Sequence, residues 1–341
     1  MKIEILPLFR LPLIRLALTA CIGLAGCGDA DQDAPADEVL LEAPFAALTD
    51  SIRQAPRNDV YYFHRAVLLN KSSLSELALA DFQKAWSLRG DEKYAFGIAN
   101  IWLDRSPDSA VVFLRSALNR LPESYLLRVT LARAEDALGK TDEALSTARE
   151  LLQQNPAIAE GWLIQADLLG KKQDAAGSLQ SLEKAYELAP ANLEIAFKLM
   201  YALAEAKNKR ALSLCDTLIR QDTGRLHADP YYVKGLYYSN TGENAQAIHW
   251  FDETIRHDIN YLNAYIEKGK ILLNEKKITE AQPVFELANR VKPAFPDAYY
   301  WIGVCQEARG QKEEALLNYQ KAYGLDKSFT EAREAADRLS K

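Results

Sequence analysis

The sequence has few of the residues that most often carry catalysis or bind metals. Its 341 residues include four histidines and four cysteines. It contains no His-Glu-x-x-His motif, no glycine-rich phosphate-binding loop, no Gly-x-Ser-x-Gly motif and no paired Cys-x-x-Cys motifs. We therefore expect no enzyme activity, no cofactor, no bound metal and no small-molecule substrate.

The chain also has no excess of positive charge. The formal net charge is −6, and no run of lysine and arginine could neutralise a row of phosphates. Nucleic acid is therefore not an expected partner. The chain is 48% hydrophobic and 26% charged, which is the composition of an ordinary folded protein with enough apolar residues for a core.

The first 27 residues have the character of a targeting segment. The basic residues Lys2, Arg10 and Arg15 come first, an apolar run covers residues 16–26, and Cys27 follows. A helix needs about 20 apolar residues to span a bilayer, so this run is too short to do so.

The end of this run, Leu24-Ala25-Gly26-Cys27, resembles the lipobox of bacterial lipoprotein signal peptides. The resemblance implies that residues 1–26 are removed and that Cys27 becomes the lipidated N-terminus. Several acyl chains give durable anchoring, whereas a single chain gives marginal binding. Two alternatives stay open: a second box that ends at Cys21 and leaves a shorter apolar run, and a soluble protein with an apolar N-terminal helix.

Residues 27–38 are expected to form the lipidated cysteine and a flexible acidic tether, because residues 28–38 offer almost nothing to bury. In the best-known sorting rule, an aspartate after the cysteine retains a lipoprotein in the inner membrane. Gly28 takes that position here, so the resemblance implies the bacterial outer membrane. Whether the chain faces the periplasm or the cell surface stays open.

The rest of the chain repeats with a period of about 34 residues, which is typical of a helical repeat array. Pro122, Pro156 and Pro190 are spaced by 34 residues, and Pro293 follows 103 residues later. A second pattern recurs with the same period: a small residue is followed by a bulky one four positions later and by another small one seven positions later. Residues at these spacings lie on one face of a helix. The small residues that begin this pattern are Ala110, Ala144, Ala247, Ala281 and Ala315.

This pattern resembles the tetratricopeptide repeat (TPR), a unit of two antiparallel helices, here called A and B. The residues that carry the resemblance are clearest in one unit, at Tyr231, Gly235, Tyr238, Gly242, Ala247 and Phe251. It implies an all-α, right-handed TPR solenoid of about eight helix-turn-helix repeats over residues 59–329. The expected repeats start near Asp59, Asp91, Tyr125, Ala159, Leu193, Ala228, Leu262 and Pro296.

The ends of such an array need polar caps, because no repeat buries its apolar face alone. Residues 39–58 are expected to provide an N-terminal capping helix and residues 330–341 a C-terminal one. We expect local bends in the first repeat and in the repeat over residues 193–225, where the pattern is irregular. Pro283 lies inside an expected B helix and should kink it unless that helix starts late.

Two cysteines remain outside the targeting segment. Cys215 and Cys305 fall in repeats three apart, so a disulfide between them is not expected. Both are expected to be small, buried, apolar residues.

In TPR proteins the A helices line a concave face on which partner segments bind. The resemblance places the fifth residue of each repeat in that groove, as an apolar stripe with aromatic residues. These residues are Phe63, Ala95, Val129, Leu163, Phe197, Tyr232, Ile266 and Tyr300. The alternative is that these side chains are half-buried against helix B. Polar contacts in the groove are expected from Asn70, Lys71, Lys270 and Asn274.

The sequence therefore favours a binding protein. The first hypothesis is a lipid-anchored scaffold or adaptor of the bacterial cell envelope, whose protein partners belong to an assembly, secretion or motility complex. The alternative is a glycan- or peptidoglycan-binding envelope lipoprotein that stacks sugar rings on the aromatic groove. A hydrolase or transferase is a third hypothesis, with no motif to support it.

Replacement of the cysteine tests the lipid anchor. Cys27→Ser removes the thiol that would carry the diacylglycerol, so the variant should move from the membrane fraction to the soluble fraction of lysed cells. Immunoblots of the two fractions measure this, with Cys21→Ser as the matched control. Unchanged membrane association of Cys27→Ser would refute lipidation at this residue.

Overall fold

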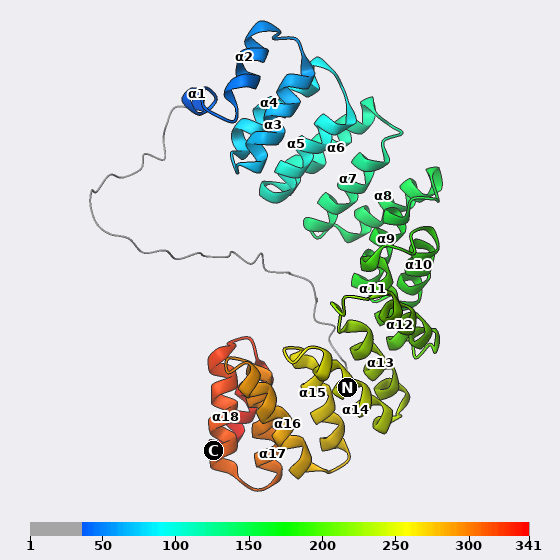
Figure 1. Ribbon diagram of the computed structural model, residues 1–341, viewed down its shortest axis with the longest axis vertical. Helices are drawn as coiled ribbons and strands as arrows, with labels where there is room; N and C mark the ends of the chain where they lie inside the picture. Colours follow the sequence, from blue (N-terminus) through cyan, green and yellow to red (C-terminus); the bar gives the residue numbers. More distant parts are fainter. Residues whose placement is uncertain (1–35, 341) are drawn as a thin grey trace, which may run out of the picture.

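The computed structural model describes residues 36–340, and every regular element in that range is an α-helix. Nineteen helices follow one another along an open arc (Figure 1). The expected all-α solenoid is confirmed. The expected signal peptide, Cys27 and most of the expected tether lie outside the described residues.

Sixteen of these helices form eight helix-turn-helix pairs. The A helices are α3 (Asp59–Lys71), α5 (Glu92–Arg105), α7 (Tyr125–Ala137), α9 (Ala159–Lys171), α11 (Leu193–Glu205), α13 (Asp229–Thr241), α15 (Leu262–Asn274) and α17 (Pro296–Ala308). The B helices are α4 (Ser75–Leu88), α6 (Pro107–Arg120), α8 (Thr141–Gln154), α10 (Ala175–Leu188), α12 (Arg210–Gln221), α14 (Asn244–His257), α16 (Ile278–Val291) and α18 (Lys312–Leu325). Six expected repeat starts coincide with the first residue of an A helix, and Asp91 and Ala228 are the N-cap residues of the other two.

Short helices close both ends of the array. At the C-terminus, α19 (Thr330–Leu339) packs against α18, within the segment expected to form the C-terminal cap. At the N-terminus, α1 (Ala36–Val39) and α2 (Ala46–Gln54) take the place of a single helix. Pro44 lies between them and cannot donate a backbone N–H to a continuous helix. The tether was expected to end at residue 38, but α1 already begins at Ala36, so the expected boundary lies within this helix.

Local side-chain caps fix the starts of several helices. Asn58 Oδ1 accepts a hydrogen bond from Val60 N at 3.1 Å, and Ser124 Oγ accepts one from Leu127 N at 3.1 Å. Each cap satisfies a backbone donor that has no partner within the first helical turn. Gly242 ends α13 with a φ of 83°, in the left-handed region that favours glycine.

Helix α16 contains Pro283 and is continuous from Ile278 to Val291. The helix therefore does not start late to avoid the proline, and it loses one backbone hydrogen bond at that residue.

The two helices of a repeat approach closely because a small residue of helix A faces a ring of helix B. A Cβ atom added at Gly235 would lie 2.5 Å from the Phe251 ring, and one added at Gly303 would lie 2.8 Å from the Tyr319 ring. Both rings are almost completely buried. A methyl group would therefore force the helices apart, and glycine permits this packing.

Successive A helices also contact one another. Direct contacts join α5 to α7, α7 to α9, α11 to α13, and α15 to α17. Within residues 36–340, successive B helices make no comparable contacts. The chain therefore curves toward the A helices, which line the inner face of the arc in Figure 1.

The fifth repeat departs most from the regular pattern. Its helix α12 is followed by an irregular connection over residues 222–228. Asp222 holds this connection, since its Oδ1 accepts a hydrogen bond from Leu226 N at 3.0 Å and its Oδ2 accepts one from His227 N at 2.8 Å. These hydrogen bonds lower the pKa of the Asp222 carboxyl. Because α11 contacts α13 directly, the stack continues across the irregular connection.

The packing of Gly269 provides a test of the close approach. A Cβ atom at Gly269 would overlap the Phe285 ring, whereas one at Gly170 in α9 would have its nearest neighbour at 3.7 Å. We expect Gly269→Ala to destabilise the fold by roughly 1–3 kcal/mol through overpacking, and Gly170→Ala to be neutral or slightly stabilising. Thermal unfolding followed by circular dichroism should show a lower midpoint for Gly269→Ala. Equal midpoints for the two variants would contradict this account of the packing.

Candidate functional site

The fifth residue of most repeats is buried rather than exposed on the inner face. Val129, Leu163, Tyr232 and Ile266 are 1%, 6%, 8% and 7% exposed. An A helix contacts neighbours on several sides, so a wide face of it is buried. The expected open apolar stripe is therefore wrong at these positions. Whether any of these residues contacts a partner stays a prediction.

Three aromatic residues at the fifth position are half-buried: Phe63, Phe197 and Tyr300. The ring centroid of Phe63 lies 5.3 Å from that of Tyr94, and that of Tyr300 lies 5.0 Å from that of Phe329. The centroid of Phe63 also lies 6.0 Å from that of Phe82 in α4, and that of Tyr300 lies 5.6 Å from that of Tyr319 in α18. Phe63 and Tyr300 are therefore half-buried against helix B, which is the alternative that the sequence left open.

In the second repeat, the register expected from Asp91 is one residue early. Helix α5 starts at Glu92, and Asp91 is its cap, with its Oδ1 accepting a hydrogen bond from Lys93 N at 3.2 Å. Ala95 is the fourth residue of α5 and is fully buried, and Phe96, the fifth, is partly exposed. Ala95 therefore does not line the groove.

The ninth residue of several repeats is accessible on the inner face. Arg133, Asp167, Tyr201 and Lys270 occupy this position and are exposed or partly exposed. A residue four positions further along a helix is rotated by about 40°, which turns the ninth residue away from the core. Of these four residues only Lys270 was expected in the groove, because periodicity identifies the buried face of a helix but not where the edge of that face lies. Counting four residues on from the fifth position of each repeat would have identified the ninth position from the sequence.

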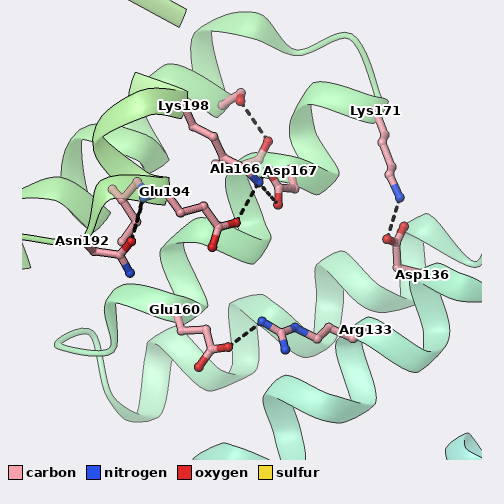
Figure 2. A network of polar contacts seen from close by, with 11 residues as sticks. Arg133, Asp136, Glu160, Ala166, Asp167, Lys171, Asn192, Glu194 and Lys198 are labelled. Atoms are coloured by element: carbon pink, nitrogen blue, oxygen red, sulfur yellow. Dashed lines mark hydrogen bonds and ion pairs between the residues drawn. The ribbon is translucent and has the colours of Figure 1, made fainter. Parts of the chain in front are cut away.

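Charged side chains on the inner face of α7, α9 and α11 pair with one another between successive A helices, as Figure 2 shows. The pairs, with N···O distances of 2.6, 2.6 and 2.7 Å, are Arg133–Glu160, Lys171–Asp136 and Lys198–Asp167. An exposed pair of this kind contributes about 0–1 kcal/mol. These charges neutralise one another, so this part of the inner face offers little net charge to a ligand.

A cluster of tyrosines lies further along the inner face, between α11, α13 and α15. The hydroxyls of Tyr201 and Tyr261 are 3.0 Å apart, and each lies 3.1 Å from Asp229 Oδ1. The ring centroid of Tyr232 lies 4.8 Å from that of Tyr261 and 6.5 Å from that of Tyr201. Burial raises the pKa of all three hydroxyls, so they are neutral at physiological pH. We call these four residues the tyrosine cluster.

The polar residues expected in the groove are at the surface. Asn70 and Asn274 are exposed, and Asn70 lines a surface hollow with Asn100 and Asp104. The Nζ of Lys270 lies 2.8 Å from the Oε1 of Glu267 on the same helix. Their contact with a partner stays a prediction.

The described residues hold no candidate metal site. In residues 36–340, no group of three or more His, Cys, Asp and Glu side chains is placed to bind a metal ion. Cys215 and Cys305 are unbonded and fully buried, as expected, and burial raises the pKa of each thiol to about 12. A neutral, buried thiol is a poor nucleophile.

Membrane-spanning helices were sought in the same part of the chain. None of the described helices has both the length and the hydrophobicity needed to cross a bilayer.

The two buried thiols should resist modification while the chain is folded. In a Cys21→Ser, Cys27→Ser double variant, we expect Ellman's reagent to react with neither Cys215 nor Cys305 under native conditions, and with both after denaturation. The reaction is followed by absorbance. Rapid modification of either thiol in the native protein would show that its burial is wrong.

Comparison with known proteins identifies the repeat. Residues 102–168 and residues 266–328 each match a family model described as tetratricopeptide repeat. A TPR protein from Parabacteroides merdae has a similar structure, with a TM-score of 0.58 and 16% identity, over 72% of this chain and 98% of that one. Yeast Tom70 is also similar, with a TM-score of 0.51 and 15% identity, over 78% of this chain and 59% of that one. At these identities the likeness shows the fold alone.

One curated relative is human superkiller complex protein 3. It is 24% identical over 155 residues, which cover 45% of this chain and 10% of that protein. The chain thus spans about a tenth of the length of this relative. Together with the eight helix pairs, the family matches show that this chain contains tetratricopeptide repeats arranged as a helical solenoid.

Proposed function

We propose that this chain is a lipid-anchored scaffold of the bacterial cell envelope that binds segments of partner proteins along the inner face of its A helices. Tetratricopeptide repeats typically mediate protein–protein interactions. The observation that carries the proposal is the row of eight A helices on one side of the arc. Such an array forms an extended surface that suits a polypeptide segment.

The burial of the aromatic rings favours a protein partner over a glycan. Stacking on a sugar requires an exposed ring face. Tyr232 is 8% exposed, and the Tyr300 ring is packed against those of Tyr319 and Phe329, with centroid distances of 5.6 and 5.0 Å. The accessible inner face instead carries charged and hydrogen-bonding groups, which suit the backbone and polar side chains of a polypeptide.

The lipobox-like sequence that ends at Cys27 supports the membrane anchor. Helix α1 begins at Ala36, close to Cys27 in the sequence, so lipidation there would keep the solenoid beside the membrane. Gly28 favours the outer membrane over the inner one. The proposed partners are proteins of an envelope assembly, secretion or motility complex, and catalysis is not part of the proposed function.

Affinity capture from detergent-solubilised envelopes tests the proposal. Asn274 is exposed on A helix α15, whereas Asn119 is exposed on B helix α6. A tryptophan at residue 274 would obstruct the inner face, so Asn274→Trp should recover about tenfold less of a defined protein partner, a loss of ~1.4 kcal/mol. Asn119→Trp is the matched control and should recover as much as the wild type.

Mass spectrometry of the captured material measures the recovery. Equal recovery by Asn274→Trp and the wild type would contradict binding on the inner face. Recovery of a glycan without any protein partner would contradict the scaffold proposal and favour the glycan alternative.

A further inference from the structure

One stretch of the inner face carries acidic groups that the chain leaves unpaired. Between α7 and α11 the charged groups pair with one another (Figure 2). Further along, Glu205, Asp229 and Asp297 have no basic group within 4.0 Å among residues 36–340. Asp297 is partly buried, which raises the pKa of its carboxyl, and the charge of Lys270 offsets only part of this rise. A positively charged ligand would complement this stretch.

The tyrosine cluster has unused hydrogen-bonding capacity within this stretch. Asp229 Oδ1 lies within hydrogen-bonding distance of two tyrosine hydroxyls, but Asp229 Oδ2 accepts no hydrogen bond from the described residues. Tyr232 is 8% exposed, and its hydroxyl likewise has no hydrogen-bond partner in residues 36–340. Burial is the main cause of the raised pKa of Tyr232, and the charges of Glu267, Tyr201 and Asp229 raise it further. Neither oxygen is fully buried, so a ligand or water can reach each of them and supply the missing hydrogen bond.

A carboxylate beside tyrosine hydroxyls suits a cation. The carboxylate accepts a charge-assisted hydrogen bond from an ammonium or guanidinium group, and a tyrosine hydroxyl oxygen can accept another. The chain pairs a lysine with a carboxylate in this way on the neighbouring side of α13, where Lys234 Nζ lies 2.7 Å from Asp216 Oδ1. The tyrosine cluster has the carboxylate and the hydroxyls, but no described lysine or arginine is paired with Asp229.

We propose that the tyrosine cluster, formed by Tyr201, Tyr232, Tyr261 and Asp229, binds a lysine or arginine side chain of the partner polypeptide. The cation donates a hydrogen bond to Asp229 Oδ2, and the hydroxyl oxygen of Tyr232 accepts another. Neighbouring basic residues of the partner lie toward Glu205 and Asp297. This inference rests on the proposed function, and it specifies that the bound segment of the partner is basic.

Peptide titration tests the chemistry of the site. The probe is a fluorescein-labelled peptide that alternates glycine and lysine, and two matched peptides carry norleucine or glutamate in place of lysine. The full chain should bind the lysine peptide, with an affinity that falls as ionic strength rises. The norleucine and glutamate peptides should bind at least about tenfold more weakly.

Two variants test whether the lysine peptide binds at the tyrosine cluster rather than elsewhere on the inner face. Asp229→Asn keeps an oxygen that accepts hydrogen bonds from Tyr201 and Tyr261 but removes the charge, so the affinity for the lysine peptide should fall about tenfold. Glu160→Gln removes a charge from the self-paired region and should leave the affinity unchanged. Circular dichroism checks that both variants fold.

Three results would overturn the proposal: no binding of the lysine peptide to the wild type, equal binding of the norleucine peptide, or full affinity of Asp229→Asn. Partner capture separates this inference from the scaffold proposal. If Asp229→Asn captures the envelope partner as well as the wild type does, the cationic site is wrong and the scaffold stands. If the wild type captures no protein but binds the lysine peptide as described, the scaffold proposal is wrong and the site stands.

Discussion

In the repeats toward the C-terminus, a glycine of helix A lies directly against a ring of helix B. At Gly235 and Gly303, even a methyl group would collide with the ring of Phe251 or Tyr319. Burial of an aromatic side chain contributes about 1.5–3 kcal/mol, and here that burial requires the close approach of the two helices. Each repeat contacts mainly its neighbours, so this kind of packing must recur along the array for the stack to be stable.

The same packing decides what the inner face presents to a partner. Residues at the fifth position, such as Val129, are buried between helices. Residues one turn further along, such as Arg133 and Tyr201, remain accessible. In the middle of the array the accessible charges pair between successive A helices. Toward the C-terminus, Asp229 and Asp297 have no such pairs among the described residues. One architecture thus provides a self-paired surface and a surface with unpaired acidic groups.

The helices could be predicted from the sequence because their signals are local. Asn58 caps the helix that follows it, and the 34-residue period sets where the next repeats begin.

The exposure of individual side chains could not be predicted in the same way, because it depends on how neighbouring repeats pack. Val129 and Phe197 are each the fifth residue of their A helix, yet only Val129 is buried. The tyrosine cluster was also missed, since Tyr201 and Tyr261 are 60 residues apart and no periodic pattern joins them.

The central test is whether each repeat is stabilised by packing on its neighbours. It can be made by measuring amide hydrogen exchange in each helix. Gly235→Leu would force a large side chain against the Phe251 ring. The account predicts that the amides of α13 and α14 lose protection, that α12 and α15 lose less, and that α3–α8 keep the protection of the wild type. An equal loss of protection from α3 to α18, or no loss in any helix, would contradict it.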